Sequence, residues 1–106
     1  MIEFSEWQKV ELKTAKIISA EDIPGKDKLY RLKVDDGSER QLVAGIRQEY
    51  TKEELAGKTI IIVANLKPAT IAGVESNGML LAVKGTDGKY RLLTADGEVD
   101  KGTRVE

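Results

Sequence analysis

Two short apolar runs, Thr59–Ala64 and Met79–Val83, restrict the fold of this chain more than any other feature. Each has the length and the aliphatic content of a core strand. The segment 65–78 between them holds a proline, which cannot donate to a sheet ladder, two glycines and a Ser-Asn-Gly turn signal. We therefore expect a shaped loop on a rigid β scaffold, a place where binding residues commonly lie.

The joining segment also carries polar groups that suit an oxygen-rich ligand. The side-chain amides of Asn65 and Asn77, the Lys67 ammonium and the Ser76 hydroxyl can all donate hydrogen bonds to phosphate and sugar oxygens. The alternative is that the two asparagines only fix turns. Residue chemistry leaves both interpretations open.

Composition excludes much of catalytic chemistry. The 106 residues include no cysteine and no histidine, which removes disulfides, thiol chemistry, thiolate metal sites and the usual proton shuttle. No G-x-S-x-G, P-loop or dinucleotide motif is present. We therefore expect one domain over residues 1–106 that binds without a cofactor or metal and is not an enzyme.

Charge and hydropathy indicate which partners and which cellular location suit the chain. Lys and Arg number 17 against 18 Asp and Glu, so the net charge is −1 and a nucleic-acid partner has to be met by a local basic patch. The sequence has no long apolar run and begins without the basic region and apolar core of a signal peptide. A cytoplasmic protein without a membrane partner is the expectation.

The chain begins with a helical turn and an irregular strand. Ser5 can cap a helical turn over residues 5–9. The phase of the apolar residues changes within 10–18, which predicts a bulged and bent first strand of the kind that barrels need. Residues 19–27 have the composition of a loop, with a turn at Pro24–Gly25.

A basic strand and its hairpin partner follow. Apolar and polar residues alternate over 28–34, which places Arg31 and Lys33 on the face opposite the core. Asp36–Gly37 then forms a tight turn to a third strand over 40–46. The stretch that contains these cations is the densest positive run in the chain. It predicts a binding face, and the alternative is a solvated face that only keeps the protein soluble.

The second half predicts a short helix and three further β segments. Residues 51–57 have a threonine N-cap, acids in the first turn and a glycine stop. The second apolar run becomes strand 79–84, turns at 87–88 and returns as strand 90–93. Residues 95–106 suggest a final hairpin or a pairing segment.

These elements predict an all-β fold. We expect a five-stranded OB-fold Greek-key barrel over about residues 1–84, with a short helix between strands 3 and 4, and a C-terminal β extension over about residues 85–106. OB folds bind oligonucleotides on strands 2 and 3 and with the loops that join strands 1 to 2 and 4 to 5. The basic run and the segment 65–78 fall at those positions, so two weak signals converge on nucleic-acid binding.

Four stretches resemble the tRNA-binding OB domain of methionyl-tRNA synthetases. They are Val10–Ile17, Asp27–Val34, Asn65-Leu-Lys-Pro68 and Gly73-Val-Glu-Ser-Asn-Gly-Met-Leu-Leu81, and together they span nearly the whole chain. That family includes C-terminal domains or separate β chains of the synthetases, a stand-alone bacterial tRNA-binding protein and the chaperone CsaA. The resemblance implies a homodimer formed largely through the C-terminal extension. It also implies recognition of the corner of folded tRNA with little regard to sequence.

The resemblance and the charges together give a set of candidate contacts. By position in the family motifs, tRNA-binding residues are Lys28, Asn65, Lys67, Ser76, Asn77 and Met79. The basic residues of the predicted face and its surroundings add Lys16, Arg31, Lys33, Arg40 and Lys84. Met79 has the alternative of being a core residue. The family often has His-Pro before its Asp-Lys-Leu run where this chain has Ile-Pro-Gly-Lys, so Lys26 is not assigned.

Apolar residues that a closed barrel does not need predict the dimer interface. They are Trp7, Tyr90, Leu92, Leu93, Val99 and Val105. The alternative is that they cover one end of their own barrel.

The sequence therefore predicts a non-catalytic, largely sequence-independent tRNA-binding module. It would act as a homodimer that holds or delivers tRNA for the catalytic chain of methionyl-tRNA synthetase. With only 5% aromatic residues, the chain lacks stacking platforms, so contacts to the RNA backbone and shape should dominate. The alternative is a CsaA-like peptide-binding chaperone or protein-interaction domain, which would need an apolar groove where this chain is predicted to be basic.

Overall fold

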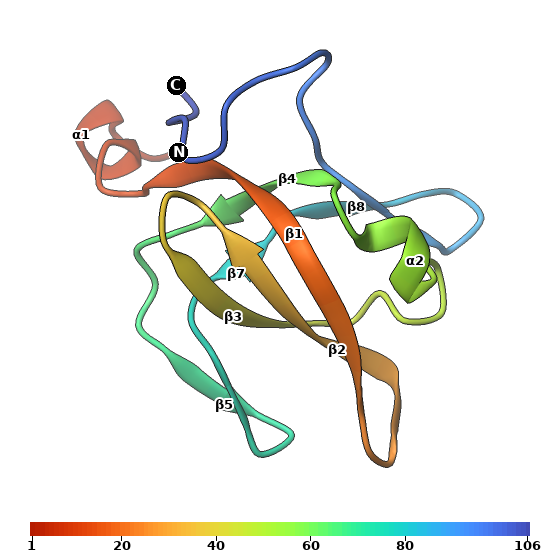
Figure 1. Ribbon diagram of the computed structural model, residues 1–106. Coiled ribbons are helices and arrows are strands. Elements are labelled where there is room, and N and C mark those ends of the chain that lie inside the picture. Colours follow the sequence, from red (N-terminus) through yellow and green to blue (C-terminus); the bar gives the residue numbers. More distant parts are fainter.

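The computed structural model describes residues 1–106 and is mostly β (Figure 1). The elements in chain order are α1 Phe4–Trp7, β1 Leu12–Ile23, β2 Lys26–Asp35, β3 Glu39–Ala44, α2 Lys52–Leu55, β4 Thr59–Val63, β5 Ala69–Ile71, β6 Val74–Ser76, β7 Met79–Leu80, β8 Ala82–Lys84 and β9 Tyr90–Leu92.

The long strand β1 organises the main sheet, which is antiparallel in the order β3-β2-β1-β4-β7. Its first half pairs with β4 and its second half with β2, and Lys16 has a partner on both sides. The register shifts between Ile17 and Ser19, which confirms the predicted bulge. The predicted loop over 19–27 is wrong, because β1 continues to Ile23, a buried residue, and only the Pro24–Gly25 turn separates it from β2.

The five strands do not close into a barrel by a continuous ladder. β3 and β7 are the edges of the sheet. Just before β7, the backbone amide of Asn77 donates to the carbonyl of Gln41 on β3 at 2.7 Å. The expected loop over 65–78 instead contains a hairpin, β5–β6, whose two strands pair only with each other. The predicted strand 79–84 is interrupted at Leu81, so β7 pairs with β4 whereas β8 pairs with β9.

Two apolar clusters lie on opposite faces of β1 and β4. Ile60 and Ile62 belong to the main core, together with the inward side of β2 and β3, while Ile61 and Val63 belong to a second cluster with Leu12. Because β4 is covered on both faces, its sequence is a continuous apolar run and not an alternating one. On β2, the residues of the main core are Tyr30, Leu32 and Val34, as the alternation predicts.

The C-terminal segment covers the second cluster. The Gly102 amide donates to the Thr14 carbonyl at 2.8 Å, and the Val105 amide donates to the Leu12 carbonyl at 2.9 Å. Leu81, Leu93 and Val105 pack on the cluster beneath. Residues 95–106 thus form a pairing segment along β1, one of the two predicted possibilities, and contain no hairpin of their own.

The two short helices follow capping rules, although one begins earlier than expected. The N-cap of α1 is Glu3, whose backbone amide donates to Glu6 Oε1 at 3.2 Å. The prediction that Ser5 caps this turn is therefore wrong. At α2, Thr51 caps as predicted: the Glu54 amide donates to Thr51 Oγ1 at 3.1 Å and the Thr51 amide donates to Glu54 Oε1 at 2.8 Å.

Gly78 gives the first prediction. Its φ is +115°, and a Cβ atom there would lie 2.9 Å from the Val63 carbonyl oxygen. We expect Gly78→Ala to lower the free energy of unfolding by about 1–3 kcal/mol or more, measured by urea denaturation. Gly88→Ala is the control, since Gly88 also has a positive φ of +81° but open space around it. Equal losses at the two positions would contradict the steric argument.

Candidate nucleic-acid interface

The outward side of β2 and β3 forms a polar face, which we call the β2–β3 face. It carries Arg31, Lys33, Gln41 and Val43, since Arg31 pairs with Val43 and Lys33 with Gln41 in a ladder whose alternate residues enter the core. Asp35 and Glu39 form the next outward pair of the same ladder, so this side holds two acids beside its two cations. Two hairpins, β1–β2 and β5–β6, extend from the same end of the sheet and flank this region (Figure 1).

The two cations of the β2–β3 face differ in their engagement. The Arg31 guanidinium forms an ion pair with Glu21 on β1, and this hydrogen bond is the main reason that the pKa of Glu21 is lowered. Lys33 is exposed, and its ammonium takes part in no ion pair or hydrogen bond, although its charge also contributes to the lowered pKa of Glu21. A phosphate can therefore bind Lys33 directly, whereas at Arg31 it has to share the guanidinium with a carboxylate.

Side-chain hydrogen bonds attach the β5–β6 hairpin to β3. Gln41 Nε2 donates to the Glu75 carbonyl at 2.8 Å. The Ser76 hydroxyl is buried, accepts from the Val43 amide at 3.0 Å and donates to the Gly78 carbonyl at 3.0 Å. At the tip of the hairpin, Ala72 has a φ of 53° and Gly73 a φ of 77°, the left-handed pair that a tight two-residue turn needs.

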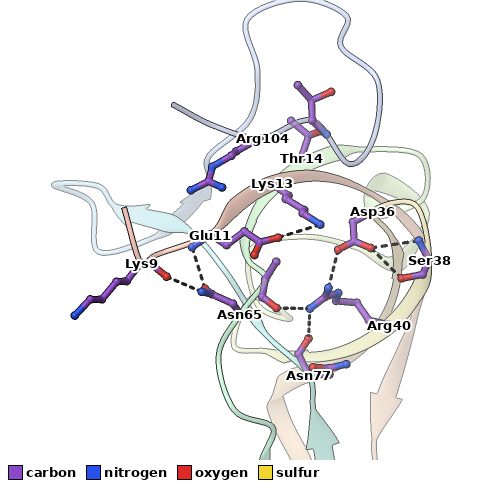
Figure 2. A network of polar contacts seen from close by, with 12 residues as sticks. Lys9, Glu11, Lys13, Thr14, Asp36, Ser38, Arg40, Asn65, Asn77 and Arg104 are labelled. Atoms are coloured by element: carbon purple, nitrogen blue, oxygen red, sulfur yellow. Dashed lines mark hydrogen bonds and ion pairs between the residues drawn. The ribbon is translucent and has the colours of Figure 1, made fainter. Parts of the chain in front are cut away.

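Arg40 lies inside the protein, although it was predicted at the binding face. Its Nη2 is 2.8 Å from Asp36 Oδ2, and the two side chains are 13% and 3% exposed. Its Nη1 donates to the Ala64 carbonyl at 2.9 Å and to the Asn77 carbonyl at 3.2 Å (Figure 2). Arg40 pairs with Val34 in the ladder, so it points inward with the core residues of its strand.

Asn65 also has a structural task. Its Oδ1 accepts from the Glu11 amide at 2.9 Å, and its Nδ2 donates to the Lys9 carbonyl at 2.6 Å (Figure 2). These bonds join the start of the β4–β5 connection to the chain just before β1. The Asn77 side chain is exposed and forms no hydrogen bond, so its amide is available to a ligand. Direct contact of either asparagine with RNA stays a prediction.

The remaining candidates are distributed over several elements. Lys28 is exposed near the β1–β2 turn, and Lys67 is exposed between β4 and β5. Met79 is 48% exposed, so the alternative that it is a core residue is wrong. Lys16 lies in a hollow with residues 97–101 of the C-terminal segment, and Lys84 is on β8 with its ammonium 5.7 Å from the centre of the Tyr90 ring.

The structure therefore brings together only part of the predicted set. Arg31 and Lys33 share one face, whereas Lys28 is exposed on β2 near the β1–β2 turn and Lys67 is exposed between β4 and β5. Lys16 and Lys84 belong to other surfaces. Sequence reasoning missed Gln41 and Val43, although their alternation with the buried residues of β3 was available as a signal. It also missed the exposed hairpin tip at 70–73.

The six residues predicted at a dimer interface divide into two groups. Leu92 packs on the main core, and Leu93 and Val105 pack on the second cluster, as the alternative of self-coverage implies. Trp7, Tyr90 and Val99 are 38%, 41% and 40% exposed. Three of the six residues, Leu93, Val99 and Val105, also line an apolar groove, together with Leu81.

No group of three or more acidic or other ligating side chains is placed to hold a metal ion. None of the helices has the length and apolarity to cross a bilayer. The fold and the site define a small β-sheet binding module whose polar face is flanked by two hairpins.

Comparison with known proteins identifies the family. The chain belongs to the family described as "Putative tRNA binding domain", whose model matches residues 12–104. It is 52% identical over 105 residues to the methionine–tRNA ligase of Thermotoga maritima and 47% identical over 105 residues to that of Archaeoglobus fulgidus. Each match covers 98% of this chain but only 16% of the relative, so the chain spans a small part of those enzymes.

Solved structures resemble the chain over its whole length. A MetRS related protein from Pyrococcus horikoshii has a TM-score of 0.92 at 41% identity, with 100% of this chain and 98% of that chain covered. The chaperone CsaA from Bacillus anthracis has a TM-score of 0.90 at 29% identity, with 100% and 99% covered. The resemblance expected from the sequence motifs is confirmed.

The hydrogen bonds of Asn65 give the second prediction. We expect Asn65→Ala to lower the free energy of unfolding by about 1–2 kcal/mol, because two backbone groups lose their partner. Asn77→Ala is the matched control and should stay within about 0.5 kcal/mol of the parent, since its side chain forms no hydrogen bond within the protein. Urea denaturation measures both. If Asn65→Ala is as stable as the parent, the bonds do not hold the connection in place.

Proposed function

We propose that this chain is a non-catalytic, largely sequence-independent tRNA-binding module that serves methionyl-tRNA synthetase. The observation that carries the proposal is membership of the tRNA-binding family combined with the exposed and unpaired Lys33 on the β2–β3 face. The relatives named methionine–tRNA ligase support the synthetase as partner, and the cytoplasm is the location that we propose with it. Within this proposal the five-stranded sheet is an OB-type barrel whose open side is bridged by side chains.

The mode of binding follows from the side chains at the surface. None of the five aromatic residues lies on the β2–β3 face, so stacking of unpaired bases has no platform there. Exposed lysines at Lys28, Lys33 and Lys67 suit phosphates. Recognition therefore rests on the backbone and the shape of a folded RNA, and the corner of tRNA is the proposed target.

The third prediction concerns these lysines. We expect Lys33→Ala and Lys67→Ala each to weaken tRNA binding several-fold and to reduce the slope of log K against log[salt] by about 0.7–0.9 per lost phosphate contact. Lys89→Ala, at the exposed β8–β9 turn, is the charge-matched control and should bind like the parent. Melting temperatures should stay unchanged in all three, because none of these ammonium groups forms an ion pair. Equal affinities for parent and all variants would place the tRNA on another surface.

A second function has a specific observation in its favour. The apolar groove lined by Leu81, Leu93, Val99 and Val105, together with the likeness to CsaA, supports capture of exposed apolar peptide segments. Ionic strength separates the two functions. The affinity for tRNA should fall steeply between 50 and 200 mM salt, by about three orders of magnitude if six phosphates are contacted. The affinity for a peptide in an apolar groove should change little over the same range.

We further propose that the chain acts as a homodimer through the C-terminal extension. A monomer of net charge −1 offers few clustered cations, and nonspecific phosphate-dominated binding is typically only ~10⁻⁴ to 10⁻⁶ M. A two-fold axis would present two β2–β3 faces to one tRNA. Trp7, Tyr90 and Val99 supply exposed apolar surface for such a contact.

The fourth prediction tests the dimer. We expect Val99→Asp to shift the protein to a monomer in sedimentation and to weaken tRNA binding by up to ~10²-fold through loss of avidity. Ile71→Asp is the control for assembly, because Ile71 has the same 40% exposure but lies on β5, and it should leave the mass unchanged. A parent that sediments as a monomer, or a dimeric Val99→Asp, excludes this interface.

A further inference from the structure

One guanidinium holds both ends of the chain segment that carries the β5–β6 hairpin. Arg40 Nη1 donates to Ala64 and to Asn77, and these two carbonyls immediately precede and follow residues 65–76 (Figure 2). The segment between them includes Lys67 and the exposed hairpin tip. The Arg40 guanidinium thus contacts the chain immediately before and immediately after this segment, in addition to the bonds that Gln41, Ser76 and Asn77 form at the base of the hairpin.

Asp36 contacts the guanidinium of Arg40, and the turn that carries Asp36 is itself contacted by the C-terminal segment and by Ser38. The Asp36 carboxylate lies 2.8 Å from Arg40 Nη2, and Asp36 as a whole residue is 6% exposed. The C-terminal segment supports the turn that carries Asp36, because a Cβ atom at Gly102 would lie only 2.4 Å from the Asp36 carbonyl oxygen. Ser38 contributes from the same turn, with its amide 3.3 Å from Asp36 Oδ1.

We infer that Arg40 is a positioning residue for RNA binding, which sets the β5–β6 hairpin against the β2–β3 face without touching the RNA itself. The inference rests on the proposed function. Its physical basis is that both terminal nitrogens of Arg40 are occupied by protein acceptors and that its side chain is 13% exposed. A lysine at this position has one point of charge and cannot serve a carboxylate and two carbonyls in a fixed planar arrangement.

The primary test compares Arg40→Lys with Arg91→Lys. Arg91 is the matched control, since it also pairs with an aspartate four residues away, Asp87, but on the exposed β8–β9 hairpin. Hydrogen exchange reports hairpin docking at two amides, Asn77, which donates to Gln41, and Val43, which donates to Ser76. In Arg40→Lys we expect these amides to exchange on the order of tenfold faster, with the core amides unchanged, and tRNA affinity to fall on the order of tenfold.

A double-mutant cycle with Lys67→Ala separates positioning from contact. If Arg40 acts through the hairpin segment, the loss caused by Arg40→Lys shrinks in the Lys67→Ala background. If Arg40 binds phosphate directly, the two losses add, and the inference is overturned. Parental affinity in Arg40→Lys with accelerated exchange at Asn77 and Val43 overturns it as well.

A second variant covers the case in which Arg40→Lys fails to fold. Asp36→Asn combined with Arg40→Gln removes both charges and so leaves no buried ion without its partner. The same exchange and affinity shifts are expected from it. Failure of the proposed function gives a different result, because a parent protein that does not bind tRNA at all can still show faster hairpin exchange in both Arg40 variants.

Discussion

A nearly buried ion pair helps to hold together the side of the sheet on which no ladder forms. β3 and β7 share no ladder, and the Asp36–Arg40 pair supplies side-chain bonds across that gap to Ala64 and Asn77. Arginine suits this place because its planar fork has several donors in fixed directions. Loss of one member of such a pair typically costs about 3–5 kcal/mol, since the other charge stays buried without compensation. Charge buried within the protein thus lies next to the base of the hairpin, beside the bonds that Gln41, Ser76 and Asn77 form there.

Exposed and buried cations have separate tasks in this molecule. Arg40 and, in part, Arg31 are committed to carboxylates of the chain, whereas Lys28, Lys33 and Lys67 have no partner in the protein. A phosphate that binds an unpaired lysine displaces only water, while one that binds a paired arginine has to compete with an existing ion pair. A chain with almost no net charge can in this way leave individual lysines available to an anionic ligand.

The sequence allowed most strands of the main sheet, the polar side of β2 and the family to be predicted, because these depend on local patterns. Alternation over 28–34 placed Tyr30, Leu32 and Val34 in the core, and the change of phase in the first strand located its bulge. What could not be predicted depends on pairs distant in the chain. Alternation with Leu42 indicates that Arg40 points inward, but nothing near Arg40 in sequence indicates its bonds to Ala64 and Asn77, and nothing near Ser76 indicates its bond to Val43. The two strands β5 and β6 are three residues each, too short for a periodic signal.

The β5–β6 hairpin is also independent of the hydrophobic core. Its strands pair only with each other, residues 69–73 are all exposed, and its bonds to β3 come from Gln41, Ser76 and Asn77 at the base. Residues at the tip can therefore change in identity, and the tip can change in length, without repacking the interior. Evolution or design can therefore vary the exposed side chains and the length of this hairpin while the rest of the sheet stays the same.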